Sequence, residues 1–173
     1  MNIKRVKKSQ GIMGLPFSVI FSIILIVFFI ITAIIAIKLF WNPAGCGFSE
    51  QAQEATFKQD LQNAVDDAWY SDRSSSDFKI NLPGQIEKVC FLDINKAEKG
   101  KNSELYDSLI LYSQNKNNFY LYPANKVCEG FRGLIIEHVN ISETTKQENP
   151  LCFENSGSLK IEKGFYDALV KIS

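Results

Sequence analysis

The chain has 173 residues and a formal net charge of zero, but its charges are unevenly distributed along the sequence. Every Asp and Glu lies at position 50 or beyond, whereas five of the 19 Lys and Arg belong to residues 1–41. Residues 42–173 therefore hold 14 basic against 19 acidic side chains, a formal charge of about −5. Nucleic-acid binding requires a basic face, so this composition argues against a nucleic-acid partner. A segment of roughly 130 residues is enough for one compact domain and too short for two.

Residues 15–37 form an apolar segment without a charged side chain. As an α-helix rising about 1.5 Å per residue, the segment spans roughly 30 Å, the thickness of the hydrocarbon layer of a bilayer. Four basic residues precede it, and basic residues mark the cytoplasmic side of a membrane helix. The sequence therefore predicts a cytoplasmic basic segment at 1–14, a single transmembrane helix at 15–41 and an extracellular domain at 42–173. The lipid bilayer is the partner that this topology implies.

Two kinds of cleaved signal share features with this segment and its surroundings. An ordinary secretory signal has an apolar core of about 7–15 residues and a small-residue cleavage site, so a retained anchor fits the longer segment better. Ala44-Gly45-Cys46 resembles the end of a bacterial lipoprotein signal, in which the cysteine is lipidated. Pro43 stands where that signal usually has Leu, and lipidation would leave an odd number of cysteines for pairing. Lipidation therefore stays a secondary alternative.

The residues before the apolar segment resemble a known processing signal. Basic residues followed by Lys8-Ser9-Gln10-Gly11 and a long aliphatic helix are similar to the class III signal of type IV pilins and archaellins, including archaeal pilin-like membrane proteins. The resemblance implies that a prepilin-type peptidase cuts on the cytoplasmic side, between Ser9 and Ile12. It also implies that the helix stays on the mature subunit and packs with like subunits.

Three features depart from the pilin pattern. No Glu stands at the fifth position after any of these cuts, and Pro16 lies early in the helix. Asn42-Pro43 interrupts a helix that pilins usually continue into the head domain. Without processing, the basic residues are simply what an anchor with a cytoplasmic N-terminus requires. Both interpretations stay open at the level of the sequence.

Four cysteines follow the apolar segment: Cys46, Cys90, Cys128 and Cys152. An even number of well-spaced cysteines on the oxidising side of a membrane predicts two disulfides. Three pairings are possible, and we favour Cys46–Cys90 together with Cys128–Cys152. Four reduced, buried thiols are the alternative. The spacing disfavours a zinc site, because no pair is C-x-x-C and His138 is the only histidine.

Residues 50–70 have the periodicity of an amphipathic helix. Positions 57, 61, 64, 65, 68 and 69 place apolar side chains on one stripe. Ser49 is the expected N-cap, and Glu50 and Glu54 lie near the positive end of the helix dipole. We expect this helix to pack across a sheet, with packing against a neighbouring subunit as the alternative.

After a polar connector at 71–77 the sequence changes to β periodicity, with β-branched and aromatic residues between turn formers. Apolar character on both faces of 105–113 suggests a central strand, and Lys163-Gly164 predicts a tight hairpin. Helix first and mostly antiparallel sheet after it is an α+β arrangement. The predicted strands are residues 78–81, 86–94, 105–113, 119–122, 133–141, 151–154, 159–162 and 165–172.

Few residues suggest catalysis, a metal or a cofactor. His138 falls in an alternating strand on a face with apolar residues, so a half-buried strand histidine is favoured over a general base. Asp93, Asn95 and Glu104 match three ligand positions of an EF-hand calcium loop, but Glu98 stands where the turn requires Gly. We therefore expect an exposed charged loop at 93–104. For the protein as a whole we expect no metal, no cofactor and no enzymatic activity.

Two further features concern the surface. Asn140-Ile141-Ser142 is an N-glycosylation sequon at the expected end of a strand. The aromatic residues at 119–123 predict a core strand, with an aromatic binding surface as the alternative. Taken together, the sequence favours a non-enzymatic, single-pass envelope protein, as a pilin-like or pseudopilin-like subunit. The alternatives are a stand-alone membrane-anchored extracellular binding module and, less favoured, an anchored hydrolase.

Overall fold

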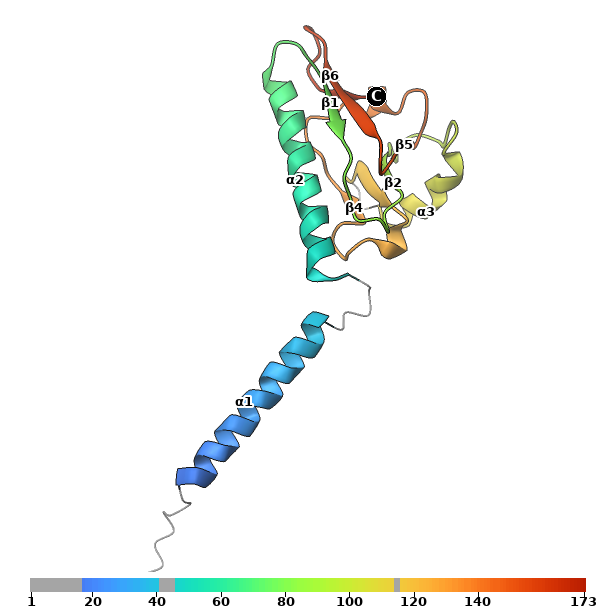
Figure 1. Ribbon diagram of the computed structural model, residues 1–173. Coiled ribbons are helices and arrows are strands. Elements are labelled where there is room, and N and C mark those ends of the chain that lie inside the picture. The colour runs from blue at the N-terminus through green and yellow to red at the C-terminus, as the bar shows by residue number, and fades with distance from the viewer. Residues whose placement is uncertain (1–16, 41–45, 114–115) are drawn as a thin grey trace, which may run out of the picture. The chain divides into compact units, whose positions relative to one another are not determined.

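The computed structural model describes residues 17–40, 46–113 and 116–173 (Figure 1). It has an α+β fold, in which an apolar helix is followed by a second helix and two antiparallel sheets. Several sequence predictions lie outside the described residues: the basic segment 1–14, the processing positions Lys8, Ser9, Gln10 and Gly11, and the joint 41–45.

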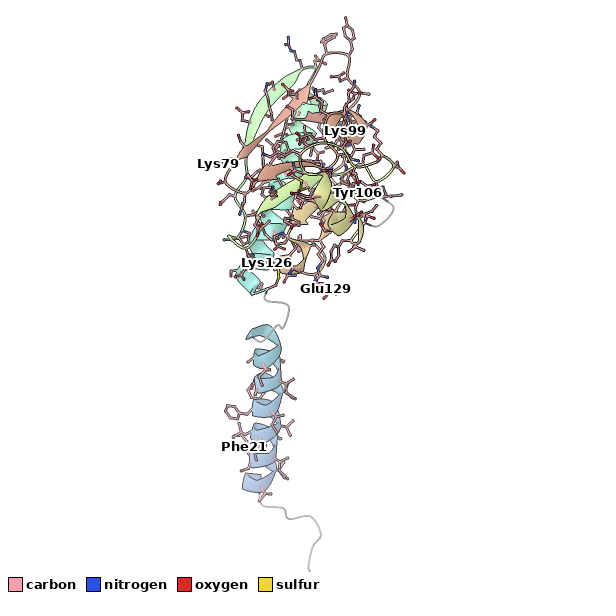
Figure 2. The ribbon with its side chains drawn as sticks, turned by 90° about the vertical axis from the view of Figure 1, so that its right-hand side faces the viewer. Phe21, Lys79, Lys99, Tyr106, Lys126 and Glu129 are labelled. Atoms are coloured by element: carbon pink, nitrogen blue, oxygen red, sulfur yellow. A yellow bond between two sulfur atoms is a disulfide. The ribbon has the colours of Figure 1, made fainter. Side chains whose placement is uncertain are left out.

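The chain divides into two compact units, residues 1–41 and 42–173. In the first unit the structure describes helix α1 (Phe17–Phe40). Among the described residues it is the one helix long and apolar enough to cross a membrane, over Val19–Ile37. All side chains in that span are exposed, and Figure 2 shows them projecting on every side of the helix. The Thr32 hydroxyl donates to two carbonyl oxygens of the preceding turn at 3.0 Å, so this polar group is satisfied within the helix.

The second unit opens with helix α2 (Phe48–Tyr70), which carries the stripe predicted for residues 50–70. Its buried residues lie on one face: Glu54, Phe57, Leu61, Val65 and Ala68. The predicted cap at Ser49 is wrong, because Gly47 is the N-cap and its carbonyl accepts a hydrogen bond from the Gln51 amide at 3.2 Å. Packing across a sheet, the favoured role of this helix, is confirmed.

Helix α2 packs on a three-stranded antiparallel sheet with the strand order β1-β6-β7. Its strands are β1 (Ser74–Lys79), β6 (Ser158–Lys163) and β7 (Lys171–Ile172). Strand β1 is at the edge of the sheet, where Ser76 pairs with Ile161 of β6. Much of the predicted connector 71–77 is therefore strand, because its serines pair through their backbone while their side chains stay at the surface. Polar side chains are typical of such an edge strand.

A second antiparallel sheet has the strand order β4-β3-β2-β5. Its strands are β2 (Lys88–Phe91), β3 (Phe119–Tyr122), β4 (Gly133–Leu134) and β5 (Leu151–Glu154). Strands β3 and β5 have the bounds predicted from the sequence, and β2 lies within the predicted 86–94. In β2, Val89, Cys90 and Phe91 are fully buried, which makes this strand the centre of the domain.

The predicted central strand at 105–113 is wrong. Residues Ser103–Leu105 form the short 3-10 helix η1, and Tyr106–Ile110 form helix α3. Leu105 and Leu109 are one helical turn apart and both buried, whereas Leu111 is 80% exposed. In a strand these apolar residues would lie on both faces. In the short helix Leu105 and Leu109 lie on one side, and Leu111 follows the end of the helix.

Two other predicted strands are shorter than expected. Of 133–141 only Gly133–Leu134 is strand, and the segment ends in helix α4 (Ile141–Thr144). Of 165–172 only the last part is strand, so a loop at 164–170 replaces the predicted tight hairpin at Lys163-Gly164. In this loop the Asp167 carboxylate accepts a hydrogen bond from the Gly164 amide at 2.8 Å, which closes a wider turn.

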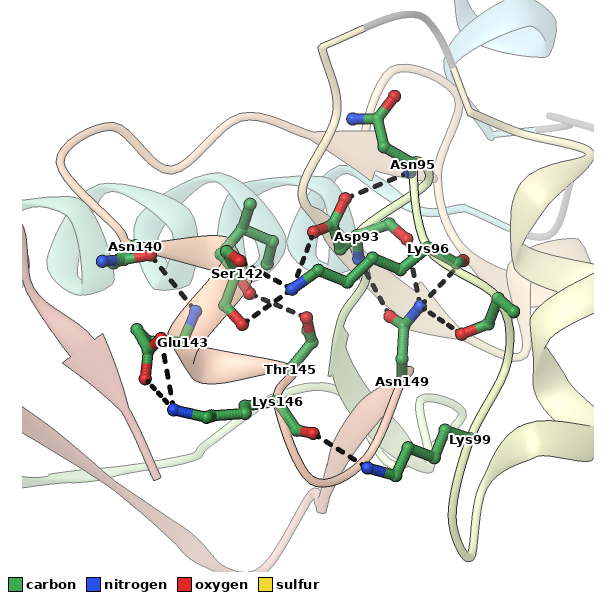
Figure 3. Close-up of polar contacts among 12 residues, drawn as sticks. Asp93, Asn95, Lys96, Lys99, Asn140, Ser142, Glu143, Thr145, Lys146 and Asn149 are labelled. Carbon is green, nitrogen blue, oxygen red and sulfur yellow. Dashed lines mark hydrogen bonds and ion pairs between the residues drawn. The ribbon is translucent and has the colours of Figure 1, made fainter.

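Asparagine side chains hold the loops between strands. The Asn149 carboxamide, 1% exposed, accepts from the Asp93 amide at 3.0 Å and donates to carbonyl oxygens of residues 93, 96 and 97 (Figure 3). Asn155 and Asn118 do the same for the backbone at 82–86 and at 136. These side chains satisfy backbone groups that irregular segments cannot pair among themselves.

Candidate functional site: the Cys46–Cys128 disulfide and Glu54

The structure pairs Cys46 with Cys128 and Cys90 with Cys152. The prediction of two disulfides is confirmed, and the favoured pairing, Cys46–Cys90 with Cys128–Cys152, is wrong. Cys90 and Cys152 lie directly opposite each other on the neighbouring strands β2 and β5, with Cα atoms 4.1 Å apart. The order of the strands in the sheet therefore decides the pairing.

The Cys46–Cys128 disulfide fastens the start of helix α2 to the rest of the domain. Cys46 directly precedes the N-cap Gly47, and Cys128 follows the 3-10 helix η2 (Ala124–Lys126). Lys126 and Glu129 flank Cys128, and Figure 2 places both at the end of the domain where α2 begins. The two Cα atoms are 5.5 Å apart, across 82 residues of sequence. The bond thus joins the place where the chain enters the domain to a distant loop.

Glu54 of α2 lies against this disulfide. Its side chain is fully buried, and its carboxylate accepts a hydrogen bond from the Cys128 amide, with donor–acceptor distances of 3.1 and 3.4 Å to the two oxygens. A carboxylate oxygen and the sulfur atoms of Cys46 and Cys128 lie within 4.8 Å of one another. Burial raises the pKa of the Glu54 carboxyl; the hydrogen bond from Cys128 opposes this rise, and the nearby charge of Glu50 adds to it.

The arrangement suits proton chemistry better than metal binding. A cysteine sulfur binds a metal as a thiolate, and here both sulfur atoms are bonded to each other. The carboxyl is then the single ionisable group of the cluster, placed beside an S–S bond in a desolvated site. Sequence reasoning assigned Glu54 only to the helix dipole. A signal for its burial was present, because Glu54 precedes Phe57 and Leu61 by helical spacings on the apolar stripe.

The prediction that His138 lies in a strand, on a face with apolar residues, is wrong. His138 occupies a turn with φ of +64°, in the left-handed region, and its ring stacks on Trp69 with a centroid distance of 3.8 Å. Its Nδ1 atom lies 3.9 Å from the Asp66 carboxylate and makes no hydrogen bond. All four cysteines are in disulfides, so no thiol is available for a Cys–His pair. The contacts of His138 join the turn to the end of α2.

The predicted charged loop after β2 is ordered by ion pairs and hydrogen bonds (Figure 3). The Asp93 side chain is largely buried and accepts a hydrogen bond from the Asn95 amide at 3.1 Å. The Lys96 ammonium lies 3.5 Å from this carboxylate and donates to the Ser142 hydroxyl at 2.6 Å. A lysine thus balances the acidic side chain of the EF-hand-like segment, while Glu104 lies in η1 at the surface.

The sequon lies at a helix start and not at a strand end. Asn140 is the N-cap of α4, and its side-chain oxygen accepts a hydrogen bond from the Glu143 amide at 3.2 Å. The Ser142 hydroxyl accepts the Lys96 bond described above. Both polar side chains of the sequon therefore have partners within the fold, and Asn140 is half-buried.

Exposed aromatic residues gather where sequence reasoning did not place them. In β3, Phe119 and Tyr120 are fully buried, so the core interpretation of that segment is confirmed. The loop 164–170 instead folds onto the end of α2, where the Trp69 indole donates to the Ala168 carbonyl at 3.1 Å. We name the exposed residues there the aromatic tip: Tyr70, Phe165, Tyr166 and Leu169, with exposed fractions of 80%, 65%, 95% and 40%.

No protein-family model, curated protein sequence or solved structure matches the chain.

Proposed function

We propose that this protein is a non-enzymatic, single-pass envelope protein that acts as a pilin-like or pseudopilin-like subunit. The observation that carries the proposal is the surface of α1. Every side chain from Val19 to Ile37 is apolar or weakly polar and exposed. A helix that is apolar on all sides requires lipid or other helices around it. Like subunits that pack through this helix would cover it on every side.

The second unit fits the display of a rigid head. Helix α2 is fixed on the sheet by its buried stripe, and the Cys46–Cys128 bond closes the point where the chain enters the domain. In an assembly held by α1, force between the helix and the head passes through this entry point. A covalent bond there keeps the start of α2 attached to the domain under such a load. Two disulfides also suit an oxidising compartment outside the cytoplasm.

Photocrosslinking in the native membrane tests the packing. A photoreactive residue is placed at Ile24 or at Ile26, which point about 200° apart around the helix. Packing on every side predicts ladders of crosslinked copies from both positions. A photoreactive residue at the exposed Asp60 of α2 serves as the matched control for contacts between heads. If neither helix position yields crosslinked copies, lateral packing through α1 is refuted.

The aromatic tip favours a second candidate, a stand-alone membrane-anchored binding module. Exposed Tyr and Phe are typical of binding surfaces. The tip lies at the end of α2 far from Cys46, and hence far from the point where the chain enters the domain. The double variant Phe165→Ala/Tyr166→Ala should then lose adhesion of the purified protein to cell envelopes. Leu111→Ala, which removes an exposed leucine elsewhere, should leave adhesion unchanged.

A further inference from the structure

We propose that Cys46–Cys128 is a thiol–disulfide exchange site for external dithiols, at which Glu54 delivers a proton to the departing sulfur of Cys128. The proposal stands on the position of one carboxyl group against both sulfur atoms of one disulfide. It does not depend on the assembly through α1, because every group involved belongs to the second unit.

The two sulfur atoms differ in access. Cys46 is 9% exposed and Cys128 is 1% exposed, so an incoming thiolate meets Cys46 first. Attack forms a bond between the reductant sulfur and the Cys46 sulfur. The S–S bond breaks, and its electron pair leaves on the Cys128 sulfur. The leaving thiolate is therefore produced in the buried part of the site.

A buried thiolate is costly without a counter-charge or a proton. Glu54 supplies the proton: its carboxyl protonates the Cys128 sulfur and becomes a carboxylate, which keeps the hydrogen bond from the Cys128 amide. The second thiol of the dithiol then attacks the mixed disulfide, releases the Cys46 thiolate and leaves the reductant as a cyclic disulfide. The products are two cysteine thiols after proton uptake from water, one oxidised dithiol and the ionised Glu54.

The charges around Glu54 define how the exchange depends on pH. On α2 the neighbouring charges are Glu50, one turn before, and Lys58, one turn after; Lys126 and Glu129 flank Cys128 in the loop packed against it. Burial raises the pKa of Glu54, and the charge of Glu50 adds to the rise. The carboxyl therefore keeps its proton at pH values where an exposed glutamate has lost it. Above that range, the ionised carboxylate repels the departing thiolate.

The second disulfide of the same molecule is an internal control. Cys90 is fully buried and Cys152 is partly exposed, so this pair also has one more accessible cysteine, which is more exposed than Cys46. Among the described residues, the cluster of a carboxylate with two sulfur atoms occurs at Cys46–Cys128 and not at Cys90–Cys152. The ratio of the two reduction rates cancels the titration of the reductant itself. What remains is the difference between the surroundings of the two disulfides, and comparison with Glu54→Gln isolates the contribution of Glu54.

The experiment measures this ratio in the full-length protein in detergent. Dithiothreitol is added at a series of pH values from 4 to 8, the reaction is quenched with N-ethylmaleimide, and alkylated peptides are counted by mass spectrometry. We expect the ratio of Cys46–Cys128 to Cys90–Cys152 reduction to fall by about tenfold or more as pH rises through the Glu54 pKa. Glu54→Gln, which keeps the shape but carries no transferable proton, should make the ratio independent of pH.

Glu50→Gln is the second variant, and it leaves Glu54 in place. Loss of the Glu50 charge should move the midpoint of the fall to lower pH without flattening it, because that charge helps to raise the Glu54 pKa. Circular dichroism checks that both variants stay folded. A ratio that does not change with pH in the wild type, or that changes identically in Glu54→Gln, overturns the proposal.

Discussion

Deletion of the Cys46–Cys128 bond should destabilise the domain by several kilocalories per mole. In the double variant Cys46→Ala/Cys128→Ala, a loop of 82 residues is no longer closed in the unfolded chain. The chain-entropy relation assigns about 4.5 kcal/mol to a loop of that length. For a domain of this size the melting temperature should fall by about 15 °C. Cys90→Ala/Cys152→Ala opens a loop of 62 residues and should cost about 4.3 kcal/mol by the same relation.

The assay is thermal unfolding of the full-length protein in detergent, followed by circular dichroism, with a thiol titration of the unfolded protein. Each of these double variants keeps one intact disulfide and should show no free thiol. Cys46→Ala/Cys90→Ala instead breaks both bonds and should release the thiols of Cys128 and Cys152. An unchanged melting temperature after loss of Cys46–Cys128 would refute the view that this bond fastens α2 to the domain. Free thiols in either matched double variant would refute the pairing.

Three further predictions concern stability. Asn149→Ala should cost about 3 kcal/mol in the free energy of unfolding, because four loop hydrogen bonds are lost in a buried site; urea denaturation measures it. Burial raises the pKa of Glu54 in the folded state, so the wild-type protein should become less stable as pH rises from the unfolded pKa through the folded pKa. The melting temperature of Glu54→Gln should lack this fall, and an equal pH dependence in both proteins would contradict the prediction. Leu109→Ala should destabilise by about 2–5 kcal/mol, whereas Leu111→Ala should change stability by less than about 0.5 kcal/mol; a strand with two buried faces would make both costly.

Some elements were predictable because their local pattern agrees with their final surroundings. The stripe of α2 repeats over several turns, and its length separates a helix from a strand without knowledge of the rest of the chain. Strands β3 and β5 are short apolar runs between turn formers, so their bounds follow from the sequence. The apolar character of α1 is also purely local.

Other elements depend on contacts between distant residues. The segment at 105–113 is too short for its periodicity to separate a strand from a helical turn. The serines of β1 carry no strand signal, and their strand conformation follows from pairing with β6. The disulfide pairing follows from β2 and β5 being neighbours, which no spacing of cysteines reveals.

The candidate site also has residues that were predictable from the sequence and one that was not. Both of its cysteines were recognised from the sequence, because the number of cysteines and their predicted compartment indicate disulfides. Glu54 was not recognised, because a glutamate near a helix start has an ordinary explanation in the helix dipole. Its position on the apolar stripe was the available signal. Its partner, the Cys128 amide, lies 74 residues away in the sequence and is found only in the folded chain.

The proposed pilin-like role is tested most directly by the intact mass of the protein purified from its native membrane. Prepilin-type processing at the signal around Lys8 and Gly11 predicts a mass that lacks residues 1–9, 1–10 or 1–11, with the apolar helix retained. Substitution of Lys8 by Ala or of Gly11 by a bulky residue should restore the full mass. A full-length mass for the wild-type protein in that membrane contradicts the pilin-like proposal and favours the stand-alone anchored module.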